Sequence, residues 1–331
     1  MMKNKQVVLV KKPEGLIDES HFSIVSTDIP SPKDGEVLVK NRYVSIDPYL
    51  RLLTEEPTTF SKGVKPGNRM ESWSVGEVVE SKSPVFHPGQ YVLGYLGWQE
   101  YGLSNERDLR PIDPSIASLP AFLGVLGMPG ITAYLGMFDY GQPQAGHTVL
   151  ISAAAGTVGM TAGQFAKMHS CKVVGITDSE EKCRFLLEEL NFDYAINGKR
   201  ENLEEKLKQC VPEGIDLYYD NVGGETLDTA LLFLRKNSRV VICGMISQYN
   251  VKTPYAIKNF ERLHSARATL KGFIVGDRTD RWPEAIRKLE AWVKEKKLKH
   301  KENVFHGLEN APKALHSIFT NAPIGKTVVE V

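Results

Sequence analysis

Residues 148–159 read TVLISAAAGTVG, and this stretch decides the fold. An apolar run enters a turn of small residues, and an apolar helical pattern follows at once. Ala154, Gly156 and Gly159 occupy the three small-residue positions of a dinucleotide-binding fingerprint. Gly156 lets the backbone approach a pyrophosphate, and Gly159 lets helix and strand pack closely. Because the first N–H groups of a helix attract anions, the stretch predicts a nucleotide site; the alternative is a plain tight turn.

The chain after Gly146 alternates apolar strands with helical segments. This rhythm predicts an α/β fold, a doubly wound parallel sheet covered on both faces. Strands are expected at Thr148–Ser152, Lys172–Thr177, Tyr194–Asn197, Ile215–Val222, Arg239–Met245 and Thr269–Val275. Helices are expected at Glu180–Leu190, Leu203–Gln209, Thr226–Leu234 and Pro283–Lys296.

The chain before Arg110 has a different character, with short β-rich runs separated by turn signals. Those signals are Lys33-Asp34-Gly35, Lys65-Pro66-Gly67 and His87-Pro88-Gly89. They predict a barrel-like domain of short strands. The closing segment from Asn310 predicts a helix and then a strand at Thr327–Val331. A chain of 331 residues is long enough for two such domains.

The overall charge argues for a small-molecule partner. The 41 basic and 40 acidic residues leave a formal net charge of +1. The chain therefore has no large excess of positive charge that would favour binding to nucleic acid or to an anionic membrane. The longest charge-free stretch, residues 114–138, contains prolines and glycines that disfavour a membrane span. The first residues lack a secretory signal pattern, and a cytoplasmic location is expected.

Cysteine and histidine usage predicts no metal site. Cys171, Cys183, Cys210 and Cys243 are scattered without the close spacing of a zinc site, so reduced, mostly buried thiols are expected. The barrel-like region has no cysteine, and its histidines are His21 and His87. Hydride chemistry in such a protein would proceed without a Lewis-acid metal.

The choice of nucleotide depends on the residues after the second strand of the parallel sheet. Ser179 and Lys182 could hold a 2′-phosphate, whereas Asp178 could accept a hydrogen bond from a free 2′-hydroxyl. Lys182 could equally be a solvated first-turn residue of a helix. The residues alone leave these alternatives open.

Six short sequence motifs, in the same order along the chain, resemble those of the zinc-independent medium-chain dehydrogenase/reductase family. This family includes prostaglandin reductases, leukotriene B4 12-hydroxydehydrogenases, plant alkenal reductases and bacterial curcumin reductases. The motifs are Ser45–Arg51, Gly127–Tyr134, Ala153–Gly159, Asp220–Gly224, Cys243–Asn250 and Gly325-Lys326. The resemblance runs from end to end. It implies a GroES-like β-barrel domain at residues 1–120, a Rossmann NADPH-binding domain at 121–300 and a segment at 301–331 that returns to the first domain.

The resemblance also implies NADPH as cofactor, a homodimer, and a cofactor-binding set. Gly156, Thr157, Val158 and Gly159 would meet the pyrophosphate, with Ser179 and Lys182 at the 2′-phosphate. The ribose and nicotinamide side would take Asn221, Cys243, Gly244, Met245, Ser247 and Tyr249. Phe273, Ile274 and Val275 would line the carboxamide edge, and Met128 and Thr132 would border the nicotinamide.

The implied activity is NADPH-dependent reduction of the C=C bond of α,β-unsaturated aldehydes and ketones. Tyr249 resembles the family's catalytic tyrosine, which with a ribose hydroxyl would donate hydrogen bonds to the developing enolate oxygen while hydride reaches the β-carbon. Tyr49 resembles a substrate-side tyrosine, or is simply a packed barrel aromatic. A quinone reductase or hydroxyl dehydrogenase of the same fold, and a non-catalytic NADPH-binding protein, are the alternatives.

Three positions depart from the family pattern. Asp178 replaces a small residue, Gly198 stands where a phosphate-side tyrosine is usual, and Pro323 stands where relatives carry an asparagine. Lys199 is the expected substitute for the missing tyrosine. The segments 55–67 and 249–259 are expected to shape the substrate pocket, and neither indicates a natural substrate.

Overall fold

The computed structural model describes residues 3–57 and 62–331 and divides into two compact units. Unit 1 comprises Met1–Gly124 and Glu302–Val331, and unit 2 comprises Val125–Lys301. The chain passes from one unit to the other inside the long charge-free stretch, which forms short helices and is largely buried. No helix within the described ranges has both the length and the apolar character that crossing a bilayer requires.

Unit 2 is built on a six-stranded, all-parallel sheet. Its strands are β8 (Thr148–Ile151), β9 (Lys172–Thr177), β10 (Tyr194–Asn197), β11 (Ile215–Asp220), β12 (Leu234–Ile242) and β13 (Thr269–Gly272). The order across the sheet is β10-β9-β8-β11-β12-β13. Chain order therefore reverses direction at β8, which lies between β9 and β11 and makes this position the topological switch point.

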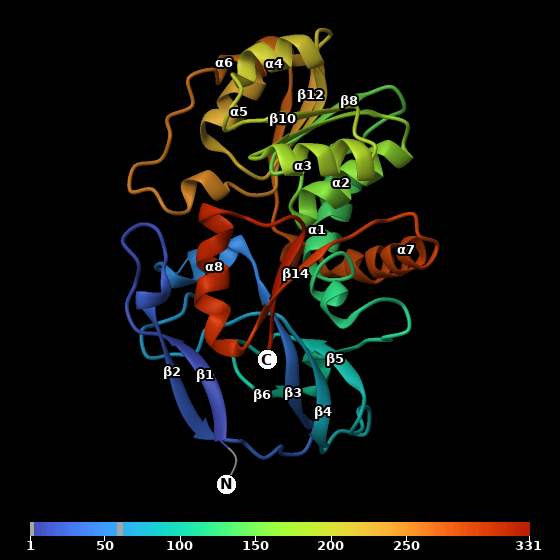
Figure 1. Cartoon of the computed structure of the whole chain (residues 1–331). Coiled ribbons are helices and arrows are strands. Elements are labelled where there is room, and N and C mark those ends of the chain that lie inside the picture. The colour runs from blue at the N-terminus through green and yellow to red at the C-terminus, as the bar shows by residue number, and fades with distance from the viewer. Residues whose placement is uncertain (1–2, 58–61) are drawn as a thin grey trace. The chain divides into compact units, whose positions relative to one another are not determined.

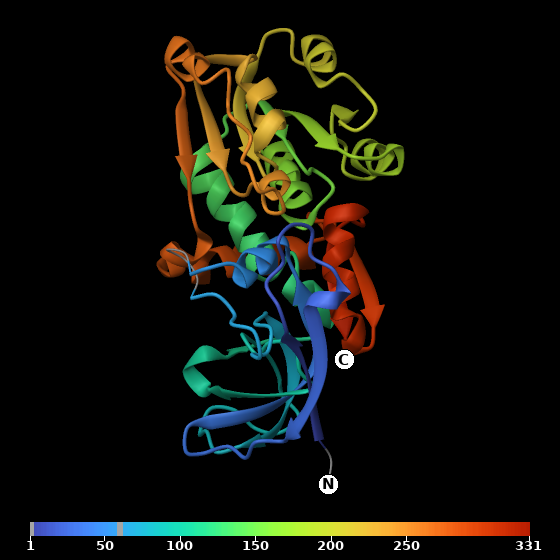
Figure 2. The same cartoon turned by 90° about the vertical axis from the view of Figure 1, so that its left-hand side faces the viewer.

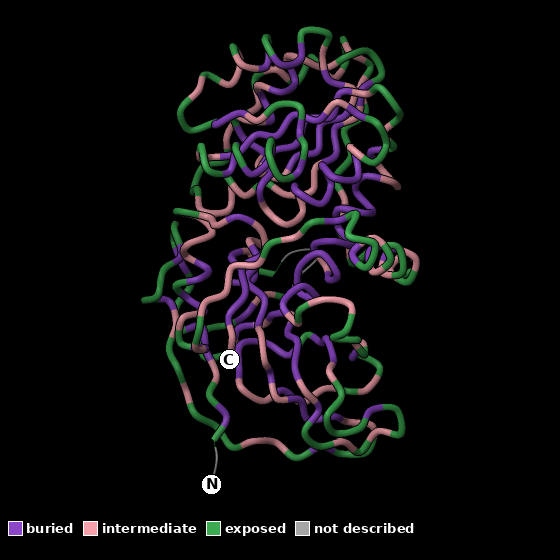
Figure 3. The backbone as a smooth tube through the Cα atoms, turned by 45° about the vertical axis from the view of Figure 1, so that its right-hand side comes forward, coloured by how far each residue is buried: buried purple, intermediate pink, exposed green. Residues whose placement is uncertain are grey.

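Helices cover both faces of this sheet (Figures 1 and 2). One face packs on α4 (Leu203–Cys210), α5 (Gly224–Leu231) and α6 (Glu261–Ala266). The other packs on α2 (Thr157–Met168); α1 (Met128–Leu135) contacts α2, α7 (Trp282–Lys294) contacts α1, and α3 (Glu180–Arg184) follows β9. Burial on both faces explains the continuous apolar runs of the strands, which are mostly buried in Figure 3. The expected parallel sheet is confirmed.

The strand ends differ from the sequence-based expectation for identifiable reasons. β11 stops at Asp220, not Val222, because the N–H groups of Val222 and Gly223 turn back to the Asp220 carboxylate. β12 stops at Ile242 because the next two N–H groups bond to the Asp220 carbonyl oxygen. α5 ends at Leu231 and β12 already begins at Leu234, which pairs with Ile215, so the predicted helix at Thr226–Leu234 ran too far.

Unit 1 contains a two-stranded sheet of β1 (Lys3–Leu9) and β2 (Phe22–Asp28), and a seven-stranded sheet. The larger sheet consists of β3 (Glu36–Ile46), β4 (Ser74–Ser81), β5 (Tyr91–Gly94), β6 (Tyr101–Asn105), β7 (Arg110–Pro111), β14 (Glu302–His306) and β15 (Lys326–Glu330). Its order is β14-β15-β3-β4-β5-β7, with β6 paired to β3.

Gly67 and Gly89 close their predicted turns with a φ of +89°, a conformation that favours glycine.

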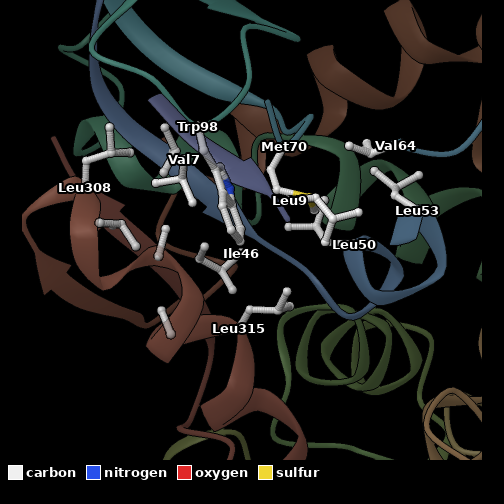
Figure 4. Packing of buried hydrophobic residues seen from close by; sticks show 14 of the residues in the cluster. Val7, Leu9, Ile46, Leu50, Leu53, Val64, Met70, Trp98, Leu308 and Leu315 are labelled. Atoms are coloured by element: carbon white, nitrogen blue, oxygen red, sulfur yellow. The ribbon is translucent and has the colours of Figure 1, made fainter. Parts of the chain in front are cut away.

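The C-terminal segment completes unit 1. Helix α8 (Ala311–Thr320) and strand β15 add Leu315 and Val329 to a core that contains Val7, Ile46 and Trp98 (Figure 4). A buried ion pair ties β15 to the start of the short helix Pro48–Thr54. The Lys326 ammonium group contacts the Asp47 carboxylate and donates to the Ile46 carbonyl oxygen at 2.8 Å. Distant parts of the sequence thus share one hydrophobic core.

Candidate dinucleotide site

The small-residue turn joins β8 to α2 at the switch point of unit 2. The N–H of Ala154 donates to the carbonyl oxygen of Ile176 at 3.0 Å, which holds the turn against β9. A Cβ at Gly159 would lie 2.5 Å from the carbonyl oxygen of Ala153, so only glycine permits this close packing of helix on turn. The packing role predicted for Gly159 is confirmed.

The first turn of α2 is open to an anion. Gly156 is the N-cap residue of this 12-residue helix, and no side chain caps its N-terminus. Thr157, Val158 and Gly159 therefore begin the helix with N–H groups that no side chain satisfies. A Cβ added at Gly156 would meet only the carbonyl oxygen of Ala153, at 3.3 Å, so the backbone here is accessible. These features suit a pyrophosphate.

Asp220 joins the carboxyl ends of β8 and β11. Its fully buried carboxylate accepts from the hydroxyls of Tyr218 at 2.7 Å and Ser152 at 2.8 Å, and from the N–H groups of Val222 and Gly223 at 2.9 and 3.0 Å. Burial raises the pKa of Asp220, while these hydrogen bonds oppose the rise. The carboxylate therefore fixes the turn that follows β11.

Asn221 is held by the same network. Its N–H donates to the Ser152 hydroxyl oxygen at 2.8 Å, and its side-chain amide donates to the Ser152 carbonyl oxygen at 2.7 Å. The sequence pointed to Asn221 but not to Ser152 or Asp220. The available signal was a polar residue at the carboxyl end of each of two buried strands.

The segment Cys243–Tyr249 is bonded along its length to the turn after β11. The N–H groups of Cys243 and Gly244 donate to the Asp220 carbonyl oxygen at 2.8 and 3.2 Å. The Ser247 N–H and hydroxyl both donate to the Val222 carbonyl oxygen, at 3.1 and 2.6 Å. These bonds place the segment at the carboxyl edge of the sheet, beside the switch point.

The Tyr249 hydroxyl folds back over this segment. It accepts a hydrogen bond from the Met245 N–H at 3.1 Å and lies close to Gly244, where an added Cβ would be 3.2 Å from it. Because the hydroxyl acts as acceptor here, its own proton remains available for another acceptor. Burial raises the pKa of Tyr249, and the Met245 N–H opposes the rise. Tyr249 is therefore a protonated donor at neutral pH.

The residues predicted to hold a 2′-phosphate lie at the carboxyl end of β9. Ser179 caps α3, its hydroxyl oxygen accepting from the Lys182 N–H at 3.3 Å. Lys182 is 8% exposed and its ammonium group lies 2.5 Å from the Asp178 carboxylate. The alternative of a solvated Lys182 is therefore wrong.

Five further predicted cofactor contacts lie elsewhere in unit 2. The Thr132 hydroxyl donates to the Met128 carbonyl oxygen at 2.8 Å within α1, and the Thr132 carbonyl oxygen accepts from the Tyr219 hydroxyl. Phe273, Ile274 and Val275 follow β13 rather than continuing it, with Ile274 42% exposed. Their contacts with a cofactor stay a prediction.

The cysteines are all free thiols. Cys171, Cys183 and Cys210 are buried, as expected, whereas Cys243 is partly exposed. Burial nevertheless raises the pKa of the Cys243 thiol to about 12, so it stays protonated at neutral pH. A protonated thiol is a weak nucleophile, which favours a packing role for Cys243.

Tyr49 belongs to unit 1. It lies in the short helix Pro48–Thr54 and packs against the core that contains Leu50 and Trp98. Burial, followed by the nearby Tyr95, raises the pKa of Tyr49 well above its usual value. This packing agrees with a barrel aromatic, and a substrate contact stays a prediction. Of the expected pocket segment 55–67, residues 58–61 lie outside the described residues.

Comparisons with known proteins agree with this geometry. Residues 5–112 match a model for the N-terminal domain of oxidoreductases, and residues 157–291 match one for zinc-binding dehydrogenases. The chain is 38% identical to the NADPH-dependent curcumin reductase of Escherichia coli, covering 99% of this chain and 97% of that protein. It is 39% identical to the 2-alkenal reductase (NADP(+)-dependent) of Nicotiana tabacum, with the same coverage. The chain belongs to the zinc-independent medium-chain dehydrogenase/reductase family.

A solved member of the family has the same fold. The crystal structure of CurA from Vibrio vulnificus in complex with NADPH matches with a TM-score of 0.93 at 35% identity, covering 99% of each chain. The predicted fold class, a Rossmann sheet with a GroES-like barrel, is confirmed by this match. In residues 3–57 and 62–331, no three His, Cys, Asp or Glu side chains gather as metal ligands would.

The departures from the family pattern have structural consequences at one place. Gly198 lies beside the end of β9, its N–H donating to the Thr177 carbonyl oxygen at 2.8 Å. Lys199 follows, and its ammonium group lies 3.3 Å from the Asp178 carboxylate. Two departures, Asp178 and Gly198, thus meet at the position where this family is expected to hold a 2′-phosphate. Pro323 lies before β15, in unit 1.

Proposed function

We propose that the chain reduces the C=C bond of α,β-unsaturated aldehydes and ketones with NADPH. The observation that carries this proposal is the Tyr249 hydroxyl, a protonated donor fixed at the carboxyl edge of the sheet beside the switch point. Relatives described as curcumin reductase and 2-alkenal reductase, similar along the whole chain, support the substrate class.

The residues of unit 2 fit a dinucleotide. The uncapped first turn of α2 and the open backbone at Gly156 suit the pyrophosphate, and the ammonium groups beside β9 suit a 2′-phosphate. On this proposal the ribose and nicotinamide lie along Asn221 and the segment Cys243–Tyr249. When bound, NADPH supplies the hydride that reduces the β-carbon.

The chain's own contribution is to stabilise charge on the substrate. As the β-carbon is reduced, negative charge moves to the carbonyl oxygen, where a preorganised donor is worth most. The Tyr249 hydroxyl is held by the hydrogen bond that it accepts from the Met245 N–H, and its own proton is donated to that oxygen. Solvent then supplies the proton for the α-carbon.

Replacing Tyr249 by phenylalanine is expected to lower the rate of enal reduction by about ten- to a thousandfold, the usual effect of removing one such donor. Because the pKa of Tyr249 is raised above its ordinary value of about 10, the donor stays protonated at lower pH, so the wild-type rate should not fall between neutral pH and about pH 9. Rates of NADPH oxidation across this pH range check both points. A Tyr249→Phe enzyme with wild-type rates would remove the proposed role.

The reaction class is tested by turnover of a substrate panel. Alkenals and enones should be reduced faster than quinones or saturated aldehydes. Mass spectrometry should identify the product as the saturated carbonyl compound. Faster turnover of quinones would favour a quinone reductase instead. Tight NADPH binding without turnover of any enal would favour a non-catalytic protein.

A homodimer is part of the proposal and rests on β13. This strand lies at the edge of the six-stranded sheet, and all four of its residues are exposed. An exposed edge offers unpaired backbone groups to a second copy of the sheet.

The cytoplasmic location expected from the sequence stays a prediction, supported by four free thiols.

Replacing Leu270 by aspartate should therefore convert the dimer to a monomer. Leu270 is 40% exposed on β13, and a charge there disfavours strand pairing. Val79, 39% exposed on β4, is the matched control, and its replacement by aspartate should leave the dimer intact. Light scattering after gel filtration measures both molar masses. A monomeric wild-type protein, or an unaffected Leu270→Asp dimer, contradicts this assignment.

A further inference from the structure

Three charged side chains meet at the carboxyl end of β9. One Asp178 carboxylate oxygen lies 2.5 Å from the Lys182 ammonium group, and the other lies 3.3 Å from that of Lys199. The side chain of Lys182 is 10% exposed and that of Asp178 is 31% exposed, whereas the side chain of Lys199 is 62% exposed. Asp178 therefore bridges both cations that the proposed function assigns to the 2′-phosphate.

The other acids of this region have different partners. Glu180 accepts from the side-chain amide of Asn197 at 2.8 Å, and Glu201 pairs with Lys206 at 2.7 Å. Within residues 3–57 and 62–331, Asp178 is thus the acid that neutralises both Lys182 and Lys199. Burial raises the pKa of Asp178, but hydrogen bonds and charges from the two lysines more than offset this and leave it lowered. The carboxylate is therefore charged at neutral pH.

The position of Asp178 gives it two opposite effects. In dinucleotide folds, an acidic residue about 20 positions beyond the glycine turn accepts a hydrogen bond from the ribose 2′-hydroxyl of NADH. Cationic side chains nearby hold the 2′-phosphate of NADPH instead. This chain has both kinds of group, already bonded to each other. A 2′-phosphate must displace the carboxylate from two lysines and then remain close to its negative charge.

We propose that Asp178 sets the cofactor preference of this chain: it competes with the 2′-phosphate for Lys182 and Lys199 and accepts the ribose hydroxyl of NADH. The chain consequently uses both nucleotides, with only a modest preference for NADPH. This inference rests on the proposed function because it takes the end of β9 as the 2′-phosphate position.

The test is a binding measurement on Asp178→Asn, independent of turnover. Calorimetry with NADP⁺ and NAD⁺ gives the two dissociation constants for wild type and variant. Removing the like charge that competes with the 2′-phosphate for the two lysines should tighten NADP⁺ binding by about tenfold. NAD⁺ binding should weaken by about threefold or more, because a neutral acceptor bonds the hydroxyl less strongly than a carboxylate does. Asp178→Ser is a second variant that should shift both constants in the same directions.

Glu180→Gln is the matched control because it removes one negative charge nearby while keeping an acceptor for Asn197. It should change NADP⁺ affinity by less than about twofold. An equal effect of Glu180→Gln and Asp178→Asn, or unchanged NADP⁺ affinity in both Asp178 variants, overturns the role of Asp178. If wild type binds both nucleotides but reduces no enal, the proposed function fails while the binding comparison still decides this inference.

Discussion

Replacing Lys326 by methionine is expected to lower the free energy of unfolding of unit 1 by about 3–5 kcal/mol. The side chains of Lys326 and Asp47 are only 3% and 7% exposed, and their charges face each other. Methionine fills nearly the same volume but leaves the Asp47 carboxylate buried with the Ser45 hydroxyl as its remaining side-chain donor. Urea titration with hydrogen-exchange readout of β3 and β15 measures unit 1 separately from unit 2.

The exposed pair of Lys3 and Asp28 provides the control. Its side chains are 53% and 82% exposed at a separation of 2.5 Å, so Lys3→Met should cost less than about 1 kcal/mol. Adding Asp47→Asn to Lys326→Met should restore part of the lost stability because no buried charge then lacks a partner. A Lys326→Met loss no larger than that of Lys3→Met contradicts the assigned importance of the buried pair.

Much of the fold could be predicted because local sequence patterns determine it. Strands such as β8 are buried on both faces and therefore consist of unbroken apolar residues. Strands whose identity depends on a distant partner were missed. β2 is mostly exposed and β14 only half-buried, so neither shows a clear apolar pattern, and both are defined by pairing with β1 and β15.

The candidate site shows the same limit. Gly159 could be assigned because its role depends on a turn within a few residues. Asp220 could not, because one of its donors, Ser152, follows β8, and only the sheet order brings that residue beside the end of β11. The sequence likewise identified Asp178 as an acceptor for a free 2′-hydroxyl and as a departure from the family pattern, but gave no sign that it bridges Lys182 and Lys199.

Replacing Asp220 by asparagine is expected to weaken NADP⁺ binding by about tenfold or more, lower turnover, and reduce the free energy of unfolding of unit 2 by about 1–3 kcal/mol. The carboxylate accepts from Tyr218, Ser152, Val222 and Gly223. An amide oxygen can replace Oδ1, which accepts all four bonds, but the N–H₂ group then faces the Gly223 N–H, which also donates to Oδ2 at 3.1 Å, and the turn must move to relieve this conflict.

The displacement should extend to Tyr249 because the segment Cys243–Tyr249 is hydrogen-bonded to the end of β11 and to the turn after it. Cys243 and Gly244 bond to the Asp220 carbonyl oxygen, so a displaced turn moves the donor of the proposed reaction. Asp216, at the opposite end of β11, is the control: Asp216→Asn keeps an oxygen for the Thr148 N–H and loses only the exposed pair with Arg235. It should leave NADP⁺ affinity and turnover unchanged. If Asp216→Asn lowers NADP⁺ affinity as much as Asp220→Asn, the loss reflects general destabilisation of β11 rather than placement of the site.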